Sequence, residues 1–300
     1  MRIRIAVGTL ALALVGPAVL VAPAEATLPP EHGFVTSSVT LPFDATQAKA
    51  LGRDLTGDGK ADNQLANVFA ALVAQGLDLT QTWNGDIRSG RIVMLHSLRS
   101  RSLVTDRNAT WQLWYGVPVT NPNLTGTGTF VAGPTRSARI PAKLVRHHLS
   151  TAASTIPVRM DLGSGPFQMP MVVGRVFATC FTRCTGGRIN GAFRSTSINA
   201  VFIPRFAQVL QALVNRDCVG PPPGTCTDGS TGATVDQIFD TAPHDLVITT
   251  DEVRKSGLVQ ALLAPDVDLY KADGSRGKDG KKDSISFGFG FSAVKARIVH

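Results

Sequence analysis

The sequence lacks the short patterns that mark the commonest enzyme families. It has no H-E-x-x-H zinc helix, and neither a P-loop nor a G-x-G-x-x-G turn follows a predicted strand. The segment Gly229-Ser230-Thr231-Gly232 lacks the spacing of the G-x-S-x-G nucleophile elbow. The six histidines show no ligand spacing with a carboxylate, so the sequence offers no local motif for hydrolytic or metal-dependent catalysis.

Paired carboxylates are the exception, because the fold rather than local spacing brings the two acids of a glycosidase together. Asp106, Asp161 and Asp236 are therefore unassigned candidates for such a pair. The sequence leaves the question of an enzyme open and leans toward a protein without catalysis.

Charged residues are also scarce, at 17% of the chain, and they give a net charge of +8. The arginines are scattered without the interleaved aromatic residues of single-strand binders, so no nucleic-acid partner is predicted. For an exported protein, a positive charge predicts weak attraction to anionic cell walls or membranes.

The first 26 residues have the three parts of a secretory signal peptide. Arg2 and Arg4 supply the positive start, an apolar run follows, and Ala24-Glu25-Ala26 is an A-x-A cleavage site. Glycine and proline interrupt an apolar run that is already short, and no later stretch is long enough to span a bilayer. We therefore expect a signal peptide at 1–26, a single secreted domain at 27–300 and no transmembrane anchor.

Only four cysteines are present: Cys180, Cys184, Cys218 and Cys226. An even number in an oxidising compartment predicts two disulfide bonds, which can be paired in three ways. We favour Cys180–Cys184 and Cys218–Cys226, because each pair is local and flanked by turn-forming residues. A four-cysteine zinc site is the alternative, although C-x3-C and C-x7-C are unusual ligand spacings.

An acidic loop leads into an amphipathic helix within residues 54–75. Oxygen-bearing side chains occupy positions 1, 3, 5 and 9 of an EF-hand loop, and the predicted metal ligands are Asp54, Thr56, Asp58 and Asp62. Position 12, normally a bidentate Glu, is Leu65, so the loop supplies only part of a calcium shell. An apolar stripe then predicts a helix with Asp62 as its N-cap and Gly76 at its end.

From 90 to 193 the sequence consists of short segments rich in Val, Ile, Thr and aromatic residues, separated by turn-forming residues. This pattern predicts an antiparallel meander or β-sandwich without the helix-length spacers of a parallel sheet. A final apolar strand at 285–299 is expected to close the sheet. The predicted fold class is α+β, with an antiparallel β-sheet or β-sandwich core and a few packing helices.

Residues 204–263 form a predicted helical and EF-like segment. Pro204 begins a helix that keeps apolar residues on one face to about residue 215. The acidic stretch Asp240–Glu252 has Leu246 in place of the turn glycine and Pro243 at a ligand position. These departures favour an EF-like turn without metal.

A second copy of the loop pattern lies within 266–299. Residues 278–284 (KDGKKDS) repeat the D-G-K-x-D of residues 57–63 (GDGKADN), in a stretch that also holds Asp266 and Asp268. Two copies are more specific than one Asp-Gly turn, although solvated turns remain the alternative. We predict a structural calcium ion here too, with ligands from Asp273, Asp279 and Asp283.

Four stretches, DLTGDGKADNQLANVFAAL, FDTAPHDLVITTDEV, LLAPDVDLY and DGKKDSISFGFGFSAV, together resemble a group of uncharacterised exported bacterial proteins. Those proteins carry D-x-[DNT]-G-D-G-x-x-D-N loops, which are similar to the calcium loops of EF-hands, dockerins and thrombospondin type-3 repeats. The resemblance covers most of the mature chain and implies a secreted or surface protein with calcium loops and no catalytic residues. Leu65 departs from dockerins, which carry Asp or Glu at the twelfth position.

The sequence therefore predicts a non-catalytic secreted or cell-surface protein, or a component of the extracellular matrix, in which calcium stabilises the fold. One alternative is a secreted hydrolase with structural calcium, which requires an exposed carboxylate pair or a Ser/His/Asp set. Another is a carbohydrate- or surface-binding sandwich, which requires an exposed aromatic patch; the candidates are Trp83, Trp111, Trp114 and Tyr115.

Overall fold

The computed structural model describes residues 28–74, 76–221, 224–241 and 243–300. The predicted signal peptide at 1–26 lies outside the described residues.

Antiparallel strands flanked by helices confirm the predicted α+β class. The strands are β1 (Glu31–Thr40), β2 (Met94–Arg99), β3 (Thr105–Gly116), β4 (Gly128–Arg136), β5 (Ile140–Val145), β6 (His148–Thr151), β7 (Ser154–Met160), β8 (Phe167–Cys180), β9 (Arg183–Arg194), β10 (Cys218–Val219), β11 (Thr225–Cys226) and β12 (Ser284–Val299). The helices are α1 (Ala45–Leu51), α2 (Leu65–Ala74), α3 (Leu79–Ser89), α4 (Ser195–Ser197), α5 (Ile203–Asp217), α6 (Thr231–Phe239), α7 (Thr250–Lys255) and α8 (Gly257–Leu262).

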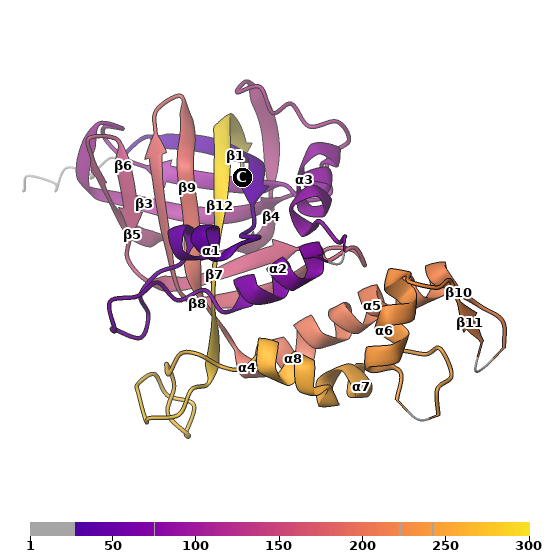
Figure 1. The fold of residues 1–300 in the computed structure, drawn as a ribbon. Coiled ribbons are helices and arrows are strands. Elements are labelled where there is room, and N and C mark those ends of the chain that lie inside the picture. The colour runs from indigo at the N-terminus through magenta and orange to yellow at the C-terminus, as the bar shows by residue number, and fades with distance from the viewer. Residues whose placement is uncertain (1–27, 75, 222–223, 242) are drawn as a thin grey trace, which may run out of the picture.

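The sheet closes on itself as a barrel of eight antiparallel strands instead of forming a sandwich (Figure 1). Around the barrel the order is β1-β2-β3-β5-β6-β8-β9-β12, and the pairings of β3 with β5 and of β12 with β1 close the ring. Strands that are close in sequence are neighbours, as the predicted meander requires. A sandwich leaves edge strands, whereas closure pairs every strand of the ring on both sides.

Two further strands of this sheet lie outside the ring, whereas β10 and β11 pair only with each other. β7 pairs with β8, and β4 bridges the ends of β3 and β12. The pairing of β4 with β12 is parallel, with Gly128–Val131 opposite Ala296–Val299. The sequence pattern predicted only antiparallel pairing, but the long chain between β4 and β12 supplies the crossover that a parallel pair needs.

Alternating side chains fill the barrel, as the width of an eight-stranded barrel allows. The inward residues include Phe34 on β1, His96 on β2, Trp111 on β3 and Phe291 on β12, all at most 5% exposed. His96 stacks on Phe291 with 4.7 Å between ring centroids and forms a 2.8 Å hydrogen bond with Thr36. Burial lowers the pKa of His96 to about 3, so this histidine is a neutral core residue.

Phenylalanine and glycine alternate at the start of β12 because the two faces of this strand have different neighbours. Phe287 and Phe289 are fully buried in the core. Gly288 faces α1, where an added Cβ would overlap the carbonyl oxygen of Leu51, so the approach requires glycine. The side-chain amide of Asn63 donates to Gly288 O and accepts from Gly288 N, both at 3.1 Å.

Helix α2 has the predicted apolar stripe and the predicted end. Its residues Leu65, Val68, Phe69 and Leu72 are buried, and Gly76 follows with a positive φ of 80°. Helix α3 was not predicted, although its boundaries have ordinary signals. Asp78 caps it by accepting from Gln81 N at 3.0 Å, and Gly90 ends it in the left-handed conformation.

Helices α4 to α8 form an insertion between β9 and β12, and Figure 1 shows this insertion packed below α2. The helix predicted from Pro204 belongs to a longer helical stretch, Ser195–Asp217, that includes a π-helical turn. By length and composition alone this stretch could cross a membrane, but half of its apolar window is buried inside the protein. The last part of the insertion consists of two short helices, α7 and α8, which are divided at Ser256.

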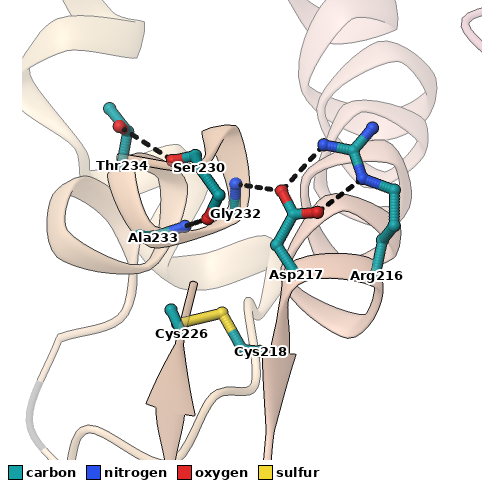
Figure 2. Close-up of polar contacts among 8 residues, drawn as sticks. All are labelled: Arg216, Asp217, Cys218, Cys226, Ser230, Gly232, Ala233 and Thr234. Carbon is teal, nitrogen blue, oxygen red and sulfur yellow. Dashed lines mark hydrogen bonds and ion pairs between the residues drawn. A yellow bond between two sulfur atoms is a disulfide. The ribbon is translucent and has the colours of Figure 1, made fainter. Parts of the chain in front are cut away.

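Both predicted disulfide bonds are confirmed: Cys180–Cys184 closes the β8–β9 hairpin, and Cys218–Cys226 joins β10 to β11. Figure 2 shows the second bond beside the joint between α5 and α6. Asp217 at this joint accepts 2.7 Å hydrogen bonds from the Arg216 side chain and from the backbone N of Gly232. The Arg216 contact lowers the pKa of Asp217 to about 2, so the carboxylate that holds the first turn of α6 stays ionised.

Substituting Gly288 tests the close approach of α1 to β12. We expect Gly288→Ala to lower the free energy of unfolding by about 2–3 kcal/mol, because the added methyl displaces backbone rather than a side chain. Gly290→Ala is the matched control, since its nearest neighbour is the flexible Leu51 Cδ2 at 3.2 Å and the cost should stay below about 1 kcal/mol. Urea unfolding of both variants measures the difference, and equal costs would contradict this packing.

Candidate functional site

The first residues of β12 position two acidic loops. The backbone N of Gln64, at the end of the first loop, donates to Ser286 Oγ at 2.7 Å. Ser286 donates in turn from its backbone N to Asp266 Oδ1 at 2.7 Å and from its hydroxyl to Asp266 Oδ2. Because Asp266 begins the second acidic stretch, one strand holds both loops in place.

The two loops also contact each other. Lys278 Nζ, in the second loop, donates to Thr56 O in the first at 3.0 Å. Figure 1 shows the loop between α1 and α2 next to the loop that precedes β12. The negative charges of Asp62 and Asp266 are close enough to repel each other. The loops therefore form one acidic region beside the helical insertion.

In the first loop, each carboxylate holds the backbone of its own turn. Asp54 accepts from Gly57 N at 2.5 Å and from Gly59 N at 2.9 Å. Asp58 accepts from Lys60 N at 2.9 Å. Bonds of this kind favour the charged form, and those from Gly57 and Gly59 lower the pKa of Asp54.

Asp62 has a different role from the one predicted. Its Oδ2 accepts from the backbone N of Leu55 and Thr56 at 2.7 and 3.0 Å, which pulls the end of the loop onto its beginning. Helix α2 begins three residues later, at Leu65, so Asp62 is not its N-cap. The prediction failed because an Asp before an apolar run has the same local pattern whether it caps the helix or the preceding turn.

The second loop repeats these hydrogen bonds. Asp268 accepts from Asp279 N and Gly280 N at 3.3 and 2.7 Å. Asp283 accepts from Leu269 N and Tyr270 N at 3.1 and 2.7 Å, as Asp62 does in the first loop. Asp279 accepts from Lys281 N at 3.0 Å, as Asp58 does from Lys60 N.

The structure thus matches Asp54, Asp58 and Asp62 with Asp268, Asp279 and Asp283. Asp273 was predicted as a metal ligand of the second loop. It lies instead in an additional exposed segment and accepts from Ser275 N at 2.8 Å. The signal for Asp268 was present in the sequence, since Asp-Leu begins both loops, at 54–55 and at 268–269. The longer spacing of the second loop concealed it.

The oxygens of the predicted metal ligands differ in their hydrogen bonding. Among the described residues, no group of three or more His, Cys, Asp or Glu side chains converges closely enough to hold a metal ion. The structure therefore does not bring the predicted ligands Asp54, Asp58 and Asp62 together around one point. Thr56 Oγ1, at loop position 3, is nevertheless buried near the Asp54 carboxylate and makes no hydrogen bond of good geometry. This oxygen is the one orphaned acceptor among the predicted ligands in the described chain.

The Asp266 carboxyl lies where the two loops meet, next to the charge of Asp62. Burial raises the pKa of this carboxyl, hydrogen bonds from Ser286 oppose the shift, and the neighbouring charge of Asp62 adds to it. Two carboxylates are thus held together with Lys278 as the cation that bridges the loops.

In the EF-like segment, the acidic side chains hold helix α7 and its preceding turn. Glu252 forms a capping box with Thr249 and also accepts from Thr241 N at 2.9 Å. Asp240 accepts from Leu246 N at 2.6 Å, at the position where an EF-hand has glycine. Leu246 adopts a positive φ of 61° there, so the turn is made without the usual glycine.

Two of the three unassigned carboxylates have an acidic partner. Asp161 faces Asp86, and the two side chains are 4% and 0% exposed. Burial and the neighbouring Asp161 together raise the pKa of Asp86 to about 6, although the ion pair with Arg91 opposes the shift. Asp236 is likewise near Asp240, and burial raises its pKa. Asp106 has no such partner; it caps a turn by accepting from Arg101 N at 2.7 Å.

Neither the carboxyl pair nor the other enzyme candidates form an open catalytic arrangement. Asp86 and Asp161 are buried, and neither lines any of five hollows on the surface of the described chain. Ser230, in the Gly-Ser-Thr-Gly segment, is the N-cap of α6 and accepts from Ala233 N at 3.1 Å (Figure 2).

The aromatic patch required by a carbohydrate-binding sandwich is not formed. Trp83, Trp111 and Tyr115 are each 1% exposed and belong to the core. Trp114 is half-buried, and the guanidinium of Arg136 covers its ring at 4.8 Å.

Comparisons with known proteins do not assign this site. No family model matches the sequence, and neither the curated proteins nor the solved structures contain a match.

The buried Asp86 predicts a specific pH dependence. Because its folded-state pKa of about 6 exceeds that of an unfolded aspartate, about 3.9, the fold favours the protonated form, and this stability is lost as the pH rises through 6. Asp86→Asn should therefore gain thermal stability relative to the parent protein between pH 4.5 and 7.

Asp106→Asn provides the opposite control, because the amides of Asn108 and Arg101 lower the pKa of Asp106. This variant should lose stability relative to the parent protein as the pH rises through the acidic range. Melting curves across that range measure both effects. A pH-independent difference for Asp86→Asn would refute the buried pair.

Proposed function

We propose that this is an exported, non-catalytic protein whose two acidic loops bind calcium as a structural ion. The observation that carries the proposal is the repeated Asp-Leu…Asp-Gly-Lys-x-Asp loop, with the same hydrogen bonds in both copies and both copies fixed to β12. The two local disulfide bonds support export, because such bonds are typical of oxidising compartments.

The donor chemistry of the first loop fits a hard cation. Asp54, Asp58 and Asp62 supply carboxylate oxygens, and Thr56 Oγ1 has no partner within the described protein. Each carboxylate oxygen carries two lone pairs, so the amide bonds leave acceptor capacity free. Calcium accepts six to eight oxygens in flexible geometry, and water completes the shell where the Glu of position 12 is replaced by Leu65.

Calcium would act here by reducing repulsion between carboxylates. Asp62 and Asp266 repel each other where the loops meet, and a divalent cation in either loop would offset the charge of its clustered carboxylates. An ion that binds only the folded state stabilises it by mass action. The result is a firmer joint between the barrel and the helical insertion.

The two alternative functions have less support in the geometry. A hydrolase with structural calcium needs an accessible acid pair, but Asp86 and Asp161 are sealed from solvent. A sandwich that binds carbohydrate through an aromatic patch needs exposed Trp and Tyr residues, and three of the four candidates are buried.

Calcium should raise the melting temperature of the mature protein relative to the same buffer with EDTA. Extracellular sites often bind with dissociation constants of about 0.1–1 mM, so 10 mM calcium stabilises a one-site fold by about 1.4–2.7 kcal/mol. For a chain of this size, such an increment corresponds to a rise of about 3–8 °C. Differential scanning calorimetry with sodium chloride at matched ionic strength measures the rise.

Asp58→Asn and Asp279→Asn should each remove part of the calcium effect. Asn keeps the oxygen that accepts from Lys60 N or Lys281 N, so each turn is retained while the charge is lost. Asp228→Asn is the matched control, because Asp228 is exposed and lies outside both loops. No calcium-dependent rise in the parent protein, or an equal loss in Asp228→Asn, would reject the proposal.

A further inference from the structure

A hollow of about 590 Å³ lies on the outer face of the barrel, across β3, β5, β6 and β8. The strand register places Lys143, Ser150, Phe177 and Arg188 in one row across four neighbouring strands. Their chain neighbours are buried in the barrel, so these four side chains point outward. At about 4.8 Å between strands, the row spans about 14 Å.

A β-bulge brings another cation to the rim of this hollow. The register of β3 against β5 shifts between Asp106 and Ala109, which places Arg107 and Asn108 opposite Lys143. Bulges re-aim side chains in this way. Arg175, two residues before Phe177 and on the same face of β8, is the third cation that lines the hollow.

The cations of the hollow have no acidic partners. No Asp or Glu lines it, and in the described chain neither Arg107, Lys143 nor Arg175 forms an ion pair. Arg175 Nε is buried without a hydrogen-bond partner, and so is Nη1 of Arg53. Arg53 is close enough to Arg175 for the two charges to repel each other. Orphaned guanidinium donors next to like charge are a feature that an anionic ligand would satisfy.

We propose that this hollow binds the phosphate or sulfate groups of an anionic saccharide. Guanidinium groups match oxyanions through paired N–H donors, and the ammonium of Lys143 adds a mobile charge. Ser150 and Asn108 supply neutral hydrogen-bonding groups, and Phe177 offers an apolar surface beside them. Since the cations line a concave site, the geometry favours a ligand that enters the hollow over a flat lipid surface.

A second hollow of about 740 Å³ extends the same face and suits a ligand longer than one sugar. Ala152 lines the first hollow, and the next residues, Ala153 and Ser154, line the second. Arg136 and Arg276 are the charged residues of the second hollow, and no Asp or Glu lines it. A chain of anionic sugars could therefore continue from one hollow into the other.

Binding of a sulfated disaccharide, measured by titration calorimetry in 50 mM sodium chloride, tests this proposal. Arg175→Gln should weaken binding at least tenfold, because it removes a charged donor with no internal partner. Arg88→Gln is the matched control; it makes the same change on the exposed end of α3 and should alter affinity less than twofold. Raising the salt to 200 mM should weaken binding of the parent protein.

Inorganic sulfate and phosphatidylglycerol vesicles distinguish the possible sources of the anion. Phe177→Leu should weaken binding of the disaccharide but not of sulfate alone, since the apolar contact serves the sugar. Equal losses in Arg175→Gln and Arg88→Gln would overturn the assignment to this hollow. Vesicle binding without binding of the disaccharide would also overturn it. Melting temperatures confirm that each variant is folded.

Discussion

The arrangement of the molecule depends on the first residues of β12. Their backbone and side chains form hydrogen bonds with segments that are far away in the sequence. Gly288 exchanges two hydrogen bonds with the Asn63 side chain, and Ser286 links Gln64 to Asp266. The absence of a Cβ at Gly288 allows α1 to pack against the strand. The strand that closes the barrel therefore also holds both acidic loops in place through hydrogen bonds.

The acidic loops place several carboxylates in a small space, and the backbone compensates part of their charge. The backbone amides of Gly57, Gly59 and Gly280 donate to aspartate oxygens. All three glycines have positive φ angles, a conformation that other residues rarely adopt. The repulsion between Asp62 and Asp266 is compensated less well. Calcium binding follows as a proposal from this remaining charge and from the unpartnered hydroxyl of Thr56.

The opposite charge is distributed over the outer face of the barrel. Its arginines look scattered in the sequence, but the register of β5, β6, β8 and β9 aligns side chains that are up to 45 residues apart. The acidic loops and the basic hollow meet near Arg53, which precedes Asp54 and lies close to Arg175. The two proposed sites are thus neighbours on one molecule.

Sequence patterns predicted the structure correctly where it depends on residues that are close in sequence. The alternation along the strands, the apolar stripe of α2 and both disulfide pairings were predictable, because each depends on contacts close in sequence. The final strand was expected to close the sheet, but the barrel was not predicted, because it requires the pairing of β12 with β1 at the opposite end of the sequence. The carboxyl pair of Asp86 and Asp161 was missed for the same reason: only the tertiary fold brings α3 to the β7–β8 connection.

Hydrogen–deuterium exchange of the two loops tests the central claim most directly, because it reports residues 54–64 and 266–286 separately. Calcium should slow amide exchange in both segments together, and Ser286→Ala should speed it in both, since Ser286 links Gln64 to Asp266. A response to calcium or to Ser286→Ala confined to one segment, or absent from both, would contradict the account of two loops held by one strand.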